Sequence, residues 1–147
     1  MKDRMCFDTN VLVYAYDSAE PAKREICGNL VAKVFGGELA GVVTNQILAE
    51  FLYATTMKAR IPFSSSEASE ALDGYVKSMQ WEKIDYAAET VAAAAKTSAT
   101  HKVPFWDALI GETMRQSGVT TIITENERDF KRIPGIKVIN PFKSGKI

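Results

Sequence analysis

Five side chains with oxygen ligands follow the carboxyl ends of candidate strands or lie in the first turns of candidate helices. Asp8, Asn126 and Asp129 come after apolar strand-like segments, Asp107 falls in the first turn of a helical segment, and Glu50 lies one to two turns into another. In open α/β sheets, ligands collect beyond the carboxyl ends of the strands. We therefore expect acids from four separate segments to meet at one edge of the sheet.

Carboxylates gathered at one edge repel one another and raise each other's pKa, which costs stability unless a cation neutralises them. Asp, Glu and Asn oxygens with no Cys or His nearby form a hard ligand set that suits Mg²⁺ or Mn²⁺ and disfavours zinc. Such an ion can polarise a phosphodiester and lower the pKa of an attacking water. The pattern therefore indicates metal-assisted cleavage of a nucleic-acid backbone.

Each of these side chains also has an ordinary structural explanation. Asp8 or Asn10 could cap a helix or form an Asx turn. Glu50 could be a boundary residue with its stem buried, and Asp107 could simply complement a helix dipole. None of these explanations accounts for all the acids sharing an edge.

The elements that must position these residues alternate between strands and helices. Ser64 and Glu67 form a capping-box pattern, Thr44 or Asn45 can cap the helix before Glu50, and Ser18 can cap the helix that contains Pro21 in its first turn. The expected strands span residues 5–7, 42–44, 82–84, 119–124 and 136–139, and the expected helices span about 21–35, 45–58, 65–79, 87–100 and 105–117. Alternation of this kind predicts an α/β fold with a mainly parallel sheet covered on both faces.

Length and composition favour one domain over residues 1–147. Lys plus Arg and Asp plus Glu both total 18, although residues 128–147 hold six basic side chains against one acid. Cys6 and Cys27 lack zinc-ligand spacing and are interpreted as small buried apolar residues. Because neither a signal-peptide pattern nor a span of about 20 apolar residues is present, we expect a cytoplasmic protein with no membrane partner.

Four motifs, in order, resemble the PIN-domain family, and within it the VapC-type toxin ribonucleases. They are "FDTNVLVYA", "TNQILAEFLYA", "FWDALI" and "TIITENERDFKRIPGIKVINP", which together cover nearly the whole chain. The resemblance implies a three-layer α/β/α sandwich whose central sheet has strand order 3-2-1-4-5. It also implies an acidic pocket at the carboxyl edge of that sheet.

The resemblance implies a role for each residue of this pocket. Asp8 and Asp107 would bind Mg²⁺ or Mn²⁺, with Glu50 a ligand directly or through water. Thr9, Asn10 and Thr124 would orient the acids or waters. The family often has an acid where this chain has Asn126, so we expect Asn126 to offer its amide oxygen to the metal while Asp129, or less favourably Glu127, supplies charge. The catalytic set is then Asp8, Glu50, Asp107 and Asp129.

The activity implied by the resemblance is cleavage of single-stranded or loop RNA by in-line attack of a metal-activated water, leaving a 5′-phosphate. The implied partners are a small antitoxin protein that inserts a basic side chain into the pocket and a second copy of the chain in a homodimer. A basic rim would help an acidic pocket to hold RNA. The candidates for contacts to the RNA backbone are Arg128, Lys131 and Arg132, together with Lys58 or Arg60.

Two other functions stay open. With Asn126 in place of an acid, the domain could be a degraded PIN fold that only binds RNA or a protein. "FDTNV" also resembles the haloacid dehalogenase phosphatases, but there a second acid stands where this chain has Asn10, and an amide cannot transfer a proton.

The remaining conspicuous residues are assigned structural roles. His101 is interpreted as a surface residue rather than a general base. Gly111, in mid-helix, predicts close approach of another segment. Four aromatic residues are assigned to packing or a dimer surface rather than to base stacking, namely Phe51, Tyr53, Phe105 and Trp106.

Overall fold

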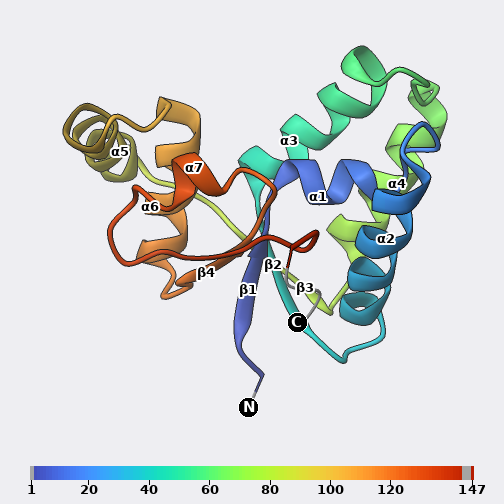
Figure 1. Cartoon of the computed structure of the whole chain (residues 1–147), viewed down its shortest axis with the longest axis horizontal. Coiled ribbons are helices and arrows are strands. Elements are labelled where there is room, and N and C mark those ends of the chain that lie inside the picture. The colour runs from blue at the N-terminus through green and yellow to red at the C-terminus, as the bar shows by residue number, and fades with distance from the viewer. Residues whose placement is uncertain (1, 144–146) are drawn as a thin grey trace.

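A sheet of five parallel strands lies at the centre of the structure, a computed structural model that describes residues 2–143 and 147 (Figure 1). The strand order is β3-β2-β1-β4-β5, as expected. Every neighbouring pair is parallel, so all carboxyl ends lie at one edge. The strands are β1 (Arg4–Phe7), β2 (Ala40–Thr44), β3 (Trp81–Ile84), β4 (Thr121–Ile123) and β5 (Lys137–Ile139).

Helices cover both faces of this sheet, which confirms the three-layer α/β/α sandwich. In Figure 1, α1, α2 and α4 lie on one side of β1, and α5, α6 and α7 lie on the other. The helices are α1 (Thr9–Tyr14), α2 (Pro21–Phe35), α3 (Asn45–Tyr53), α4 (Ser65–Lys77), α5 (Ala88–His101), α6 (Phe105–Gln116) and α7 (Glu127–Phe130), with a π-helical turn, η1 (Ala54–Lys58), continuing α3.

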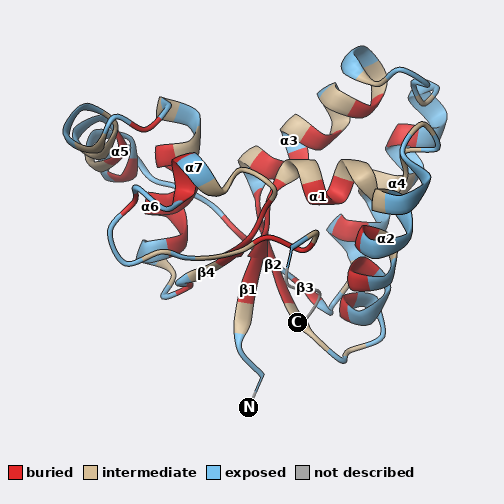
Figure 2. Cartoon of the chain, viewed as in Figure 1, coloured by how far each residue is buried: buried red, intermediate tan, exposed pale blue. Residues whose placement is uncertain are grey.

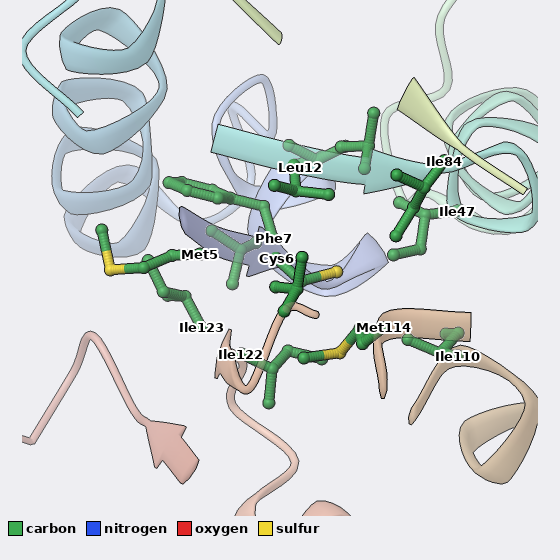
Figure 3. Packing of buried hydrophobic residues seen from close by; sticks show 14 of the residues in the cluster. Met5, Cys6, Phe7, Leu12, Ile47, Ile84, Ile110, Met114, Ile122 and Ile123 are labelled. Carbon is green, nitrogen blue, oxygen red and sulfur yellow. The ribbon is translucent and has the colours of Figure 1, made fainter. Parts of the chain in front are cut away.

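The core is built on the central strand, which is buried by helices on both faces. Buried positions follow the strands and the inner sides of the helices (Figure 2). Cys6 and Phe7 of β1 pack with Ile122 and Ile123 of β4 (Figure 3). Cys6 and Cys27 are free and fully buried, as expected from their apolar surroundings.

Local capping follows the sequence in two helices and departs from it in a third. Ser64 and Glu67 form the expected capping box, and Thr44 caps α3 through its side chain. The prediction that Ser18 caps α2 is wrong, because α2 begins after Glu20 and no side chain of the described residues caps it. Instead, the carboxylate of Asp17 accepts a hydrogen bond from the backbone nitrogen of Ala19 and shapes the turn there.

Two short helices were not expected from the sequence. The apolar residues after Asp8 form α1, whose six residues are too few to give a clear helical period. The four residues of α7 likewise lie within the segment that follows β4. Among the described residues, no helix has the length and apolar character needed to span a bilayer.

Gly111 confirms the close approach that its mid-helix position predicted. A Cβ atom at this position would lie 2.7 Å from Cδ1 and 3.2 Å from Cγ2 of Ile133, which is buried in the loop after α7. Gly28 in α2 has only a carbonyl oxygen at 3.8 Å from such an atom. The two helical glycines therefore differ in the space beside them.

We predict that Gly111→Ala lowers the free energy of unfolding by about 1–2 kcal/mol, because overpacking outweighs the helix propensity that alanine gains. Gly28→Ala, the matched control, should raise it by up to about 1 kcal/mol. Urea unfolding followed by circular dichroism measures both. In an Ile133→Val background, which removes the nearest methyl group, Gly111→Ala should cost less; equal costs in both backgrounds would contradict the steric explanation.

Candidate active site

Asp8 lies at the point where β1 ends and α1 begins. Its backbone nitrogen still bonds the carbonyl of Ile123 in β4, at 3.0 Å, while its side chain caps α1 by accepting from the backbone nitrogen of Thr9 at 2.8 Å. Its other carboxylate oxygen accepts from the hydroxyl of Thr124 at 2.7 Å and the amide nitrogen of Asn10 at 3.1 Å. The capping explanation and the shared-edge explanation therefore both hold for this residue.

Asn10 and Thr124 also hold the loop after β4. The amide nitrogen of Asn10 donates to the Thr124 hydroxyl at 3.2 Å, and its amide oxygen accepts from the backbone nitrogen of Glu125 at 3.2 Å. The same hydroxyl accepts from the backbone nitrogen of Asn126 at 2.9 Å. The loop that carries Asn126 is thus fixed to Asp8 by neutral groups.

Glu50 reaches the same region from the middle of α3. One carboxylate oxygen accepts from the hydroxyl of Thr9 at 2.7 Å, and the other accepts from the amide nitrogen of Gln46 at 3.1 Å. Gln46 also donates to the carbonyl of Trp106 at 3.0 Å. These bonds join α1, α3 and the first turn of α6.

Asp107 and Asp129 are held together by the side chain of Asn126. The Asn126 amide nitrogen donates to Asp107 at 3.2 Å and to Asp129 at 3.1 Å. This orientation directs the nitrogen, rather than the oxygen, toward the acids. The expectation that the amide oxygen of Asn126 binds a metal stays a prediction, and it requires the amide to turn.

Burial and mutual repulsion shift the acids in the direction expected for crowded carboxylates. Desolvation by burial is the largest cause that raises the pKa of Asp8 to about 6, and the charge of Glu50 adds to it. Burial likewise raises the pKa of Asp107 to about 7, with contributions from the charges of Asp8, Asp129 and Glu50. Both carboxylates would hold their charge more readily beside a cation.

A cleft of about 520 Å³ lies beside these residues, although Asp129, Thr124 and Gln46 are not part of its wall. Its wall includes Asp8, Glu50, Asp107 and Asn126, together with the basic side chains of Lys58 and Arg60 at the end of η1. Within this π-helical turn, the hydroxyl groups of Thr55 and Thr56 donate hydrogen bonds to the backbone carbonyls of Phe51 and Leu52 in the last turn of α3. Such π-helical turns are frequent at functional sites.

The basic residues after β4 lie elsewhere. Arg128, Lys131 and Arg132 are not part of the wall of this cleft. Arg128 contacts Asp129 at 3.4 Å, Lys131 pairs with Glu127 at 3.2 Å, and Arg132 donates to the carbonyl of Lys102 at 3.0 Å. Of the two acids considered beside Asn126, Glu127 bonds Lys143 and Asn140. The other, Asp129, is the acid that Asn126 joins to Asp107.

The donors around the cleft suit a hard divalent cation. They are carboxylate, hydroxyl and amide oxygens, and the two carboxylates whose pKa is raised, Asp8 and Asp107, gain stability beside positive charge. Among residues 2–143 and 147, no three His, Cys, Asp or Glu side chains converge as a ready metal cage. Mg²⁺ commonly binds through one or two carboxylates and keeps several waters, so a pair such as Asp8 and Asp107 fits its requirements.

Some residues of the site were missed by the sequence analysis. Gln46 lies four residues before Glu50, on the same side of a helix, and this spacing could have identified it as a partner. Asp17 and Glu20 also line the cleft and add acids that no motif indicated. His101, at the end of α5, does not line the cleft, which agrees with its assignment away from catalysis.

Several solved structures share this fold. VapBC2 of Rickettsia felis, bound to a DNA fragment from its promoter, has a TM-score of 0.66 at 21% identity, covering 93% of this chain and 98% of that chain. DNA-bound VapBC of Salmonella typhimurium has a TM-score of 0.64 at 20% identity, covering 95% and 98%. VapC20 of Mycobacterium tuberculosis, a toxin that cleaves the sarcin-ricin loop, has a TM-score of 0.63 at 16% identity, covering 80% and 86%.

No curated protein matches the sequence significantly. The sequence profile of the PIN domain, however, matches residues 5–136, which is most of the chain and includes every acid of the cleft. The strand order, the acids at the carboxyl edge and this match agree with one another. The chain therefore belongs to the PIN-domain family.

Proposed function

We propose that this single domain is a ribonuclease that depends on Mg²⁺ or Mn²⁺ and hydrolyses RNA to leave a 5′-phosphate. The observation that carries the proposal is that Asp8, Glu50 and Asp107, from three separate elements, line one cleft. The raised pKa values of Asp8 and Asp107 support it, because a cation between these carboxylates would stabilise their charged forms.

In this proposal each side chain has a distinct task. Asp8 and Asp107 hold the ion, Glu50 binds it directly or through water, and Asp129 adds negative charge beside Asp107. When bound, the ion polarises the phosphodiester and lowers the pKa of the attacking water. Thr9, Asn10 and Thr124 keep the carboxylates in place through the bonds described above, as neutral partners commonly do around metal sites.

Lys58 and Arg60 are the proposed contacts to the RNA backbone, because they line the cleft that the acids also line. Arg128, Lys131 and Arg132 are proposed only as more distant contacts, since all three are engaged by neighbouring groups. Positive charge near an acidic cleft raises the local concentration of RNA and offsets the repulsion of its phosphates.

We further propose that the protein acts in the cytoplasm as the toxin of a toxin-antitoxin pair. Membership of the PIN family and the fold shared with VapBC complexes support this role. The proposed antitoxin would place an Arg or Lys among the acids of the cleft, where its charge would offset their repulsion. A homodimer is also proposed, and the exposed Tyr53, Met57 and Ile61 offer it apolar surface.

The second candidate function is a domain that binds RNA or protein without cleaving it. The orientation of Asn126 favours this reading, because its amide nitrogen already offsets part of the charge of Asp107 and Asp129. A phosphatase of the haloacid dehalogenase type gains no support, because both ends of the Asn10 amide bind neighbouring groups and neither can transfer a proton.

Replacing either proposed metal ligand tests the reaction. Asp8→Asn and Asp107→Asn should each lower the rate of Mg²⁺-dependent RNA cleavage by about 100-fold or more. Replacing a residue that only hydrogen-bonds a metal ligand already lowers metal affinity or activity by about 10- to 100-fold, so replacing a ligand itself should cost at least as much. Asp73→Asn, the same change at an exposed acid in α4, should leave the rate unchanged. Circular dichroism checks that every variant is folded. Cleavage that survives both changes would exclude the mechanism, and an inactive but RNA-binding wild type would favour the second candidate.

The two basic residues of the cleft make a separate prediction. Lys58→Ala together with Arg60→Ala should weaken RNA binding and reduce the slope of log affinity against log salt by about 0.7 for each phosphate that the protein no longer neutralises. Arg128→Ala together with Lys131→Ala is the matched control and should change the slope less. Fluorescence anisotropy across a salt series measures both slopes, and a larger change in the control pair would reassign the RNA path.

The pKa shifts predict how the ion and pH act on stability. In metal-free protein, Asp8 and Asp107 keep protons that the unfolded chain has already released, so stability should fall as pH rises from about 4 to about 7. Mg²⁺ must displace these protons, so it should raise the melting temperature more at about pH 8 than at about pH 5. At a free Mg²⁺ concentration of about 100 times Kd, binding should raise the free energy of unfolding by about 2.7 kcal/mol.

Asp107→Asn should remove most of both effects, whereas Glu70→Gln on the surface of α4 should remove neither. Calorimetry in EDTA and in MgCl₂ gives the four melting temperatures for each protein. An equal shift with Mg²⁺ at both pH values would show that the ion binds elsewhere.

A further inference from the structure

A second groove, of about 450 Å³, lies beside the cleft and shares Glu50 with it. Its wall is formed by the start of α3, the segment after β3 and the first turn of α6. Two aromatic side chains, Trp106 and Tyr86, lie there with the carboxylate of Asp85 and the amide of Gln46. A molecule that occupies both the cleft and the groove would therefore pass Glu50.

Trp106 directly precedes Asp107, yet it is not packed into the protein. Its side chain is 60% exposed, and Tyr86 is 40% exposed. Of the two roles assigned to Trp106, packing is wrong within the described chain, and the dimer surface stays a prediction. Phe51, assigned in the same way, is fully buried. An exposed tryptophan one residue from a candidate metal ligand needs another explanation.

The position of Trp106 is nevertheless well defined. Phe105 lies edge-on to its ring, with centroids 5.3 Å apart and planes at 74°. Gln46 donates to the Trp106 carbonyl and to Glu50, so one amide fixes both the aromatic residue and the carboxylate shared with the cleft. The backbone of Trp106 is thus fixed beside Glu50, and the contact with Phe105 restricts its ring, which lowers the cost of ordering when a flat ligand stacks on it.

We propose that this groove binds an unpaired RNA nucleobase next to the phosphate that is cleaved, with the base stacked on Trp106. The inference rests on the proposed function. Proteins grip single-stranded RNA by stacking bases on aromatic side chains, and every base offers such a face. The phosphates then stay on the side of the cleft where Lys58 and Arg60 lie.

The charge of the groove selects a base over a phosphate. Glu50 and Asp85 are acids of its wall, and none of the described residues that line it is Lys or Arg. One oxygen of Asp85 accepts from the backbone nitrogen of Tyr86 at 2.8 Å, so the carboxylate is held in place and can accept a further bond. The groove therefore favours bases with an exocyclic amino group, such as adenine and cytosine, over uracil.

Fluorescence can isolate this contact, because the chain has two tryptophans and the other, Trp81, is 1% exposed. We would titrate the Asp8→Asn protein, in Mg²⁺, with short single-stranded RNA and with an abasic ribose-phosphate oligomer of equal length. The RNA should quench the emission of Trp106 and bind about tenfold more tightly than the abasic oligomer. Equal quenching and affinity for the two would overturn the proposal.

Variants then separate stacking from general surface effects. By anisotropy, Trp106→Ala should weaken RNA affinity about tenfold, while Trp106→Phe keeps most of the affinity but abolishes the quenching. Met79→Ala, at a residue 96% exposed in the turn before β3, is the surface control and should change neither. Asp85→Asn should reduce the preference for cytidine over uridine oligomers. Wild-type affinity in Trp106→Ala would overturn the inference.

Two further measurements distinguish this inference from the proposed function. If Trp106→Ala, in the protein that retains Asp8, cleaves RNA with an unchanged KM, the groove proposal fails and the ribonuclease proposal stands. If RNA binds through Trp106 but the wild type never cleaves it, the ribonuclease proposal fails and the groove proposal stands. If sizing shows that Trp106→Ala splits a dimer while RNA affinity is unchanged, the groove faces a second copy of the chain and the nucleobase proposal is overturned.

Discussion

The repulsion among buried carboxylates is the constraint on which the site depends. Asp8 and Asp107 come from distant parts of the chain, and the all-parallel sheet brings both to one edge. Burial is the largest cause that raises the pKa of each, and the charges of neighbouring acids raise it further, so burying and grouping these carboxylates opposes stability in the absence of a cation. The metal-free protein is therefore less stable than it would be with neutral side chains at these positions. Unfavourable local arrangements of this kind are common at functional sites.

Neutral hydrogen-bond donors make this grouping possible. Thr124 and Asn10 bind Asp8, Thr9 and Gln46 bind Glu50, and one amide of Asn126 joins the remaining two acids. Most of these donors and the acids that they bind belong to different elements, or the donor lies in the turn next to the acid. The same contacts that orient the carboxylates therefore also fasten α1 to α3 and the loop after β4 to α6.

The surroundings of the site divide by charge. Lys58 ends η1 and Arg60 lies just beyond it, and the two give the cleft a basic part beside its acids. The groove past Glu50 is acidic and aromatic instead. A polymer with charged phosphates and flat bases matches this division, because its two kinds of group need opposite surroundings.

From the sequence by itself, the alternation of strands and helices predicted an α/β fold with a parallel sheet and acids at its carboxyl edge, because these patterns are local and parallel topology leaves few arrangements. The strand order and the family followed from the resemblance of four motifs to PIN domains. Only the tertiary structure decided which basic residues line the cleft, that the Asn126 nitrogen joins Asp107 to Asp129, and that Trp106 is exposed. These features depend on contacts between residues far apart in the chain, and no local periodicity encodes the direction in which such side chains point.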